Sequence, residues 1–186
     1  SEAAGEAAQA LNEGMESPRA TLFTFLGSIN EAQTSSDAWT RVMACMDLSS
    51  VNPDRGEEVA TELLGVINRL GEVKPTDLPD EEMVSASGAK EFMFFPRSGV
   101  HDWVRKSANF EGSVVLVLQG DGVWRFSSGT VKGVSGLYRD LQSLEVRYGL
   151  DEKDLSFSKW IENKMPVALR DGRLFNLAYW QMILLF

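Results

Sequence analysis

The chain has one cysteine and one histidine among its 186 residues, and this scarcity excludes several kinds of site. With Cys45 alone, no disulfide can form within the chain and no all-cysteine metal site can exist. With His101 alone, a multi-histidine metal site is excluded as well. We therefore expect neither a metal site nor a cofactor.

Basic residues are also scarce, since 18 Lys and Arg stand against 27 Asp and Glu, for a formal net charge of −9. The imbalance lies in residues 1–96, which hold six basic and 17 acidic residues. Phosphate binding needs clustered Lys and Arg, so we expect no nucleic-acid partner. The 24% charged and 44% hydrophobic residues are typical of one soluble globular domain.

The chain lacks an apolar run of the roughly 20 residues that a membrane-spanning helix needs. Within an apolar segment at 172–186, Leu174–Phe186 (LFNLAYWQMILLF) carries no charge over 13 residues. This run is either a buried element of the domain or the start of a membrane helix. In the second case Tyr179 and Trp180 would lie at the membrane interface, which both residue types favour.

At the other end, residues 1–16 contain four Glu and no basic residue. A signal peptide needs a basic start and an apolar core, so this segment is not one. We interpret it as a mobile acidic lead-in.

Residues 17–71 are predicted to hold three amphipathic helices. Their start signals are Ser17-Pro18, Ser36-Asp37 and Asn52-Pro53. Apolar residues follow each start at helical spacing, and Gly71 is a stop signal for the third helix.

The rest of the predicted domain extends to residue 171 and contains signals for a loop, a set of strands and a helix. Residues 72–90 are rich in acids and contain two Pro, which indicates a loop. Residues 91–127 are predicted to form an antiparallel meander with strands at 91–98, 101–106, 113–118 and 123–127 and a tight turn at 119–122. Residues 128–148 are predicted to be a helix, in which Gly133 and Gly136 suggest a close neighbour. The expected fold class is α+β, with amphipathic helices packed on the meander, then a helix and the apolar C-terminal segment.

Residues that could carry chemistry are few. Cys45 lies among apolar residues and is predicted to be an inert core thiol. Neighbouring residues on a strand point to opposite faces, so His101 would not meet the Asp102 carboxylate. We therefore interpret His101 as a lone surface histidine. Gly120 and Gly122 are followed by Arg125 where a dinucleotide-binding loop needs a third glycine. We therefore expect no catalytic residue and no enzyme.

Two acidic clusters and a set of aromatics remain. Asp80-Glu81-Glu82 and Asp151-Glu152-Asp154 lack the spacing of a calcium loop and are interpreted as solvated charge. The predicted strands carry aromatic residues that either line a small-molecule pocket or fill the core: Phe94, Trp103, Trp124 and Phe126.

Five segments together resemble one known family. They are SPRATLFTFLGSINEA (17–32), WTRVMACMDLSS (39–50), RGEEVATELLGVINRL (55–70), VWRFSSGTVKGVSGLY (123–138) and GRLFNLAYWQMILLF (172–186). Their order and spacing resemble the extracytoplasmic N-terminal region of bacterial small-conductance mechanosensitive (MscS-like) channel homologues. Residues 91–112 have no counterpart in that pattern.

The resemblance implies a non-catalytic domain on the periplasmic face of the bacterial inner membrane. Its partners would be the rest of a membrane channel and the lipid bilayer, and its subunits would form a homo-oligomer. It would modulate gating, assembly or partner contacts. An alternative is a cone-shaped ligand-binding domain, because the opening helix and the W-x-F-S strand are also similar to the nuclear transport factor 2 superfamily. A cytoplasmic adaptor that presents residues 174–186 to a partner is a third interpretation.

Overall fold

The computed structural model describes residues 12–32, 34–147, 173–174 and 177–178. Its helices are α2 (Pro18–Glu31), α3 (Ala38–Ala44), α4 (Gly56–Leu70), α5 (Glu81–Ser87), α6 (Asp102–Ser107) and α7 (Ser128–Leu141). Its strands are β1 (Glu91–Phe95), β2 (Val114–Leu118), β3 (Trp124–Phe126), β4 (Arg173–Leu174) and β5 (Leu177–Ala178). Short 3-10 turns are η1 (Leu48–Ser50), η2 (Pro53–Arg55) and η3 (Pro75–Asp77). The predicted α+β class is confirmed.

The three predicted N-terminal helices are present. The Ser17 hydroxyl accepts a hydrogen bond from the Ala20 N–H, and Pro18 opens α2. Asp37 precedes α3 without a side-chain cap, and α4 begins at Gly56, after the η2 turn that Asn52 caps. Gly71 ends α4 with a φ of 107°, a backbone conformation that favours glycine.

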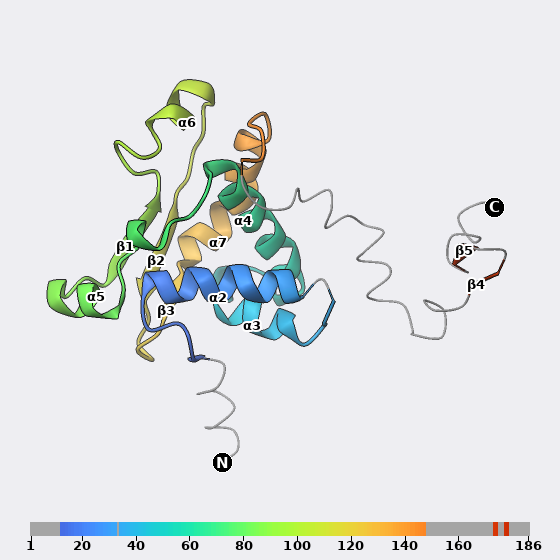
Figure 1. Ribbon diagram of the computed structural model, residues 1–186, viewed down its shortest axis with the longest axis horizontal. Coiled ribbons are helices and arrows are strands. Elements are labelled where there is room, and N and C mark those ends of the chain that lie inside the picture. The colour runs from blue at the N-terminus through green and yellow to red at the C-terminus, as the bar shows by residue number, and fades with distance from the viewer. Residues whose placement is uncertain (1–11, 33, 148–172, 175–176, 179–186) are drawn as a thin grey trace, which may run out of the picture.

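Strands β1, β2 and β3 form an antiparallel sheet in chain order. The antiparallel meander is confirmed with three strands, because the segment predicted as a fourth strand, 101–106, is helical and β1 pairs directly with β2. Met93 lies opposite Val115, and Leu116 lies opposite Phe126. The turn between β2 and β3 closes with Gly122 at a φ of 84°. Helices α2, α3, α4 and α7 gather on one side of the molecule, whereas α5 and α6 lie toward β1 (Figure 1).

The outer edge of β3 is closed by two segments that are distant in sequence. The Trp124 N–H donates to the Met15 carbonyl at 2.8 Å, and the Phe126 N–H donates to the Cys45 carbonyl at 2.9 Å. The Asp47 N–H donates to the Phe126 carbonyl at 2.9 Å. These bonds satisfy backbone groups that an edge strand would otherwise leave open.

The segment before α2 differs from the predicted lead-in over residues 12–16. The Met15 side chain is fully buried in the core, and the Gly14 carbonyl accepts the Thr24 hydroxyl at 2.7 Å. The folded part of the chain therefore begins before Ser17, because one apolar side chain and its backbone close the sheet. Residues 1–11 lie outside the described residues.

Helix α7 is fixed to the sheet and to α4. Ser127 caps it, and the buried Thr130 hydroxyl accepts the Val115 N–H at 2.8 Å. A Cβ atom at Gly65 of α4 would lie 2.6 Å from the Tyr138 ring, so glycine permits the close approach of α4 and α7. Within the part of the chain that is described, Gly133 and Gly136 have nothing within 4 Å of such an atom, so the close neighbour expected there is not found.

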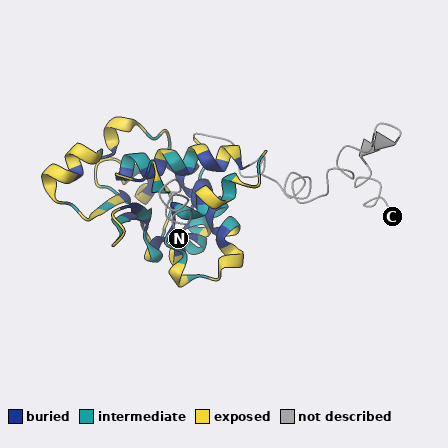
Figure 2. Cartoon of the chain, turned by 90° about the horizontal axis from the view of Figure 1, so that it is seen from below, coloured by how far each residue is buried: buried dark blue, intermediate teal, exposed yellow. Residues whose placement is uncertain are grey.

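Buried side chains from all these elements form the core, while the outer faces of the helices are exposed (Figure 2). Phe25 of α2 meets Phe126 of β3 edge to face, with ring centroids 5.2 Å apart. Burial of such aromatic rings holds the helices on the sheet.

Three boundaries differ from those expected. The predicted loop at 72–90 contains η3 and α5, because Asp80 caps α5 and Gly88 ends it in the left-handed conformation. The predicted strand at 101–106 is helix α6, which begins after a turn held by His101. The predicted helix at 128–148 ends at Leu141 and is therefore shorter than expected. The strands also fill less of the predicted strand region 91–127, because α6 occupies part of it.

The role of Met15 can be tested by truncation to alanine. We expect Met15→Ala to lower the free energy of unfolding by about 2–4 kcal/mol, because it removes a fully buried side chain. Met83→Ala, at an exposed methionine, is the matched control and should change it by less than about 0.5 kcal/mol. Urea unfolding measures both, and equal effects would contradict the placement of Met15 in the core.

Candidate functional site

The aromatic residues singled out from the sequence belong to the core. Phe94, Trp124 and Phe126 are buried. Trp103 lies on α6 rather than on a strand and packs partly buried against the core, with the Arg147 guanidinium 3.6 Å from its ring centroid. None of the four lines the hollow between α6 and β2 or the hollow between α5 and β1. The cone-shaped ligand-binding alternative therefore gains no support from them.

Cys45 is buried immediately after α3, as its apolar neighbours predicted. Its Sγ donates to the Arg41 carbonyl at 3.3 Å. Burial raises the pKa of the thiol to about 12, against the opposing effect of Arg41 and Arg125. Since the thiolate is the nucleophile, this cysteine is held in its unreactive form.

His101 is buried, so its interpretation as a surface histidine was wrong. Its Nδ1 accepts the Arg97 N–H at 3.1 Å, and its backbone N–H donates to the Arg97 carbonyl at 2.9 Å. Its ring packs edge-on against Phe95, with centroids 5.1 Å apart. Burial, and secondarily the charge of Arg97, lowers the pKa of His101 to about 4. The neutral imidazole thus shapes the turn before α6.

A hollow of about 730 Å³ lies beside the segment between α6 and β2. Its lining is Pro96, Arg105, Ala108, Asn109, Phe110, Glu111, Gly112 and Asp140. The Asp140 carboxylate already accepts the Glu111 N–H at 3.0 Å. More of its surface is polar than apolar, whereas small-molecule sites are lined mainly by apolar side chains.

A second hollow of about 400 Å³ separates α5 from β1, and we name it the α5–β1 groove. It is lined by Thr76, Asp77, Leu78, Pro79, Met83, Val84, Ser87, Ala89, Glu91, Phe92 and Arg97. Its surface is mainly apolar, with a few polar groups among the apolar side chains. Ligand sites have this composition and this range of volume.

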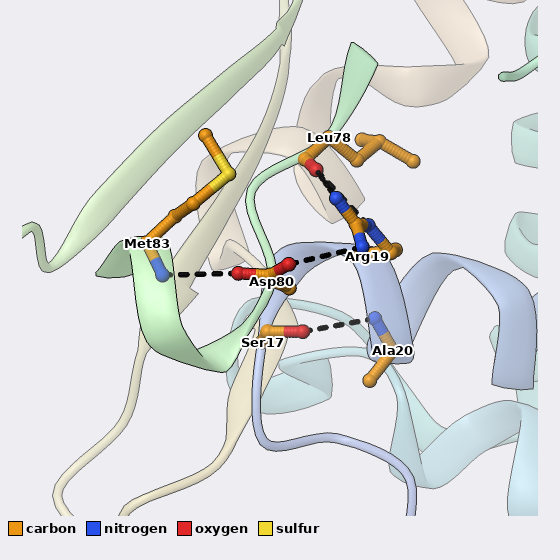
Figure 3. A network of polar contacts seen from close by, with 6 residues as sticks. All are labelled: Ser17, Arg19, Ala20, Leu78, Asp80 and Met83. Atoms are coloured by element: carbon orange, nitrogen blue, oxygen red, sulfur yellow. Dashed lines mark hydrogen bonds and ion pairs between the residues drawn. The ribbon is translucent and has the colours of Figure 1, made fainter. Parts of the chain in front are cut away.

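One wall of the groove is fastened to α2 by Arg19 (Figure 3). The Arg19 guanidinium donates to the Leu78 carbonyl at 2.9 and 3.1 Å and to Asp80 at 3.1 Å. The other oxygen of Asp80 accepts the Met83 N–H at 3.0 Å and so caps α5. This brace joins the start of α2 to the start of α5 and fixes the wall in place.

Arg97 is the one cation among the described residues that line the α5–β1 groove. Its Nη1 donates to the Asp77 carbonyl, 2.6 Å away, and its guanidinium lies 5.6 Å from the Phe92 ring centroid. Its Nε is buried and has no hydrogen-bond partner among the residues that the structure describes. A buried donor without an acceptor is costly, and a bound ligand can supply the acceptor.

The other acidic and aromatic residues singled out from the sequence fall into two groups. Asp80 caps α5 and Glu81-Glu82 begin it, so they do not lie in a loop, but both glutamates are exposed as predicted. Asp151, Glu152, Asp154, Tyr179 and Trp180 lie outside the described residues. Within the described ranges, no group of three or more His, Cys, Asp or Glu side chains is placed to hold a metal ion.

The sequence analysis missed the α5–β1 groove, because it treated one wall as a loop. The usable signal was Asp80, an N-cap residue type three positions before Met83, with Gly88 as a stop signal. Together they indicate a short capped helix.

Comparison with known proteins found no matching family model, no matching curated protein and no matching solved structure. In the part of the chain that the structure describes, no helix combines the length and the apolar character that crossing a membrane requires.

Burial of His101 predicts a pH dependence of stability. The unfolded chain binds a proton near pH 6.5 and the folded chain only near pH 4, so stability is full above about pH 6.5 and falls as the pH decreases toward 4. His101→Asn keeps an acceptor near Nδ1 but does not titrate. Between about pH 7 and pH 4.5, we expect the free energy of unfolding to fall by about 1–2 kcal/mol more in the native protein than in this variant. Parallel pH profiles in urea unfolding would contradict a buried neutral imidazole.

The raised pKa of Cys45 predicts slow chemical modification. At about pH 8 the folded protein should react with a thiol reagent only through unfolding, because burial suppresses the thiolate. Reaction should become fast in concentrated urea, where the thiol has its ordinary pKa. Rapid labelling of the folded chain, followed by absorbance, would show that Cys45 is accessible.

Proposed function

We propose that this chain is a non-catalytic domain that stands on the periplasmic face of the bacterial inner membrane, in a homologue of the small-conductance mechanosensitive channels. In that setting it modulates gating or assembly, or contacts partner proteins. The rest of the channel and the bilayer are its proposed neighbours.

The observation that carries this proposal is where the resembling segments lie. Four of them form α2, α3 with η1, α4, and β3 with α7, which pack against one another. Phe25 meets Phe126, the Ser50 hydroxyl donates to the Ser128 carbonyl at 3.0 Å, and Gly65 lies against Tyr138. Residues without counterpart, 91–112, form β1 and α6, which add Phe94, Phe95 and Val104 to the same core. The support for the proposal is therefore the mutual packing of the four resembling segments.

The two residues most suited to catalysis support a non-catalytic role. Cys45 has a raised pKa and His101 a lowered one, and each is already used in packing or in a turn. Neither is exposed to a substrate in the structure.

Liposome flotation tests the membrane part of the proposal. The full chain should float with vesicles of phosphatidylethanolamine and phosphatidylglycerol, because the uncharged run Leu174–Phe186 can enter the bilayer. The double variant Leu184→Lys with Leu185→Lys should lose nearly all flotation, because each lysine costs about 3 kcal/mol inside a membrane.

The matched control adds the same two charges at exposed positions of the folded part, by Met83→Lys with Met93→Lys. This control should float like the native chain. If neither the native chain nor the control floats, or if the Leu184→Lys, Leu185→Lys variant floats equally well, the proposed membrane attachment through this run is wrong.

A further inference from the structure

The sheet has one closed edge and one open edge. Met15, Cys45 and Asp47 bond the outer side of β3. Immediately before β1, the Lys90 carbonyl accepts the Leu118 N–H at 2.9 Å, so Lys90 bonds toward β2. Because residues alternate along an antiparallel strand, the backbone N–H and C=O of Glu91 and Met93 point away from β2. No backbone group of the described residues bonds to them on that side.

The α5–β1 groove lies on this open side. Its lining comes from the 76–79 segment and α5 on one wall and from residues 89–97 on the other, while β2 contributes none of it. Figure 1 shows α5 next to the start of β1. An extended segment of chain placed in the groove would therefore run beside β1, where backbone donors and acceptors are available.

Arg97 adds a specific requirement for the occupant. Its buried Nε–H needs an acceptor, and it lies in a lining that also contains the acidic residues Asp77 and Glu91. A carboxylate ligand would be repelled by those two acids, whereas a neutral carbonyl oxygen satisfies the donor without that cost. Backbone carbonyls of a peptide have this chemistry.

The charge around the groove indicates what flanks the occupant. Residues 72–91 carry six acidic residues and two basic ones, Lys74 and Lys90. Asp80 is paired with Arg19, but Glu81 and Glu82 are exposed at the start of α5. Basic residues on either side of a bound segment would be attracted to this rim. A second copy of this chain would bring the same acidic segment against it and is therefore disfavoured.

We propose that the α5–β1 groove is a docking site for an extended apolar segment of a partner protein, flanked by Lys or Arg, which adds to β1 as a strand. Alternate apolar side chains of the segment enter the groove over Leu78, Val84 and Phe92, and one of its carbonyls accepts from the Arg97 Nε. This docking proposal specifies the partner contacts of the proposed function and rests on that part of it. It requires no membrane attachment.

The test titrates nitrogen-15-labelled full-length protein with the peptide KVTVTVK, blocked at both ends, and follows amide and arginine Nε–H signals by NMR. We expect saturable shifts of the Glu91 and Met93 amides and of the Arg97 Nε–H. The same peptide N-methylated at every valine and threonine should produce none of them, because neither edge of its strand then offers these N–H groups for pairing. The glutamate-flanked peptide EVTVTVE should bind about tenfold more weakly.

Two exposed positions give a matched pair of variants that leaves the core intact. Met83→Lys places a charge at the groove and should weaken binding about tenfold, while Val100→Lys makes the same change outside the lining and should leave binding unchanged.

Absence of saturable shifts, shifts away from β1, or equal binding of the N-methylated peptide would overturn the proposal. Concentration-dependent pairing of the protein through β1, detected by light scattering, would show a second copy as the occupant instead. Flotation does not involve this groove, so failure of the docking proposal and failure of membrane attachment give different results.

Discussion

The fold depends on how the outer edge of β3 is closed. Trp124 and Phe126 bond to Met15 and Cys45, residues that precede them by about 80 to 110 positions. Thr21 of α2 adds a buried bond to the Trp124 carbonyl at 2.9 Å. Edge strands expose backbone groups that invite foreign pairing, and here the chain's own N-terminal segments satisfy them. Because these bonds hold α2 and the end of α3 against the sheet, the core of Phe25 and Phe126 is enclosed.

The opposite edge has not been closed in the same way. The Arg19 brace holds the 76–79 segment and the start of α5 against α2, and a groove remains between these elements and β1. Arg97 lines that groove, and its buried Nε has no hydrogen-bond partner among the described residues. The molecule thus separates a closed side, which carries stability, from an open side, which is available for binding. The proposed partner contacts use the open side, whereas Cys45 and His101 are both buried in the interior.

The sequence predicted the helices at 17–71, the meander and the tight turn at 119–122, because caps, apolar periodicity and glycine positions are local signals. It failed where a single contact decides the structure. His101 was placed on a strand, but its bond to the Arg97 N–H and its burial against Phe95 make it the start of α6. Met15 was assigned to a lead-in, since nothing local shows that its carbonyl reaches Trp124. The α5–β1 groove could not be predicted, because Arg19 holds one wall to α2 across about 60 residues of chain and the Arg97 bond to the Asp77 carbonyl joins the two walls.

Amide hydrogen exchange would show whether one edge of the sheet is closed and the other open. We expect the Asp47, Trp124 and Phe126 amides to exchange only through unfolding of the whole domain, since each donates to a backbone carbonyl at the β3 edge. The Glu91 and Met93 amides should exchange orders of magnitude faster, because they point away from β2. Protection of Glu91 and Met93 equal to that of Trp124, or rapid exchange at Trp124 and Phe126, would contradict this division of the sheet.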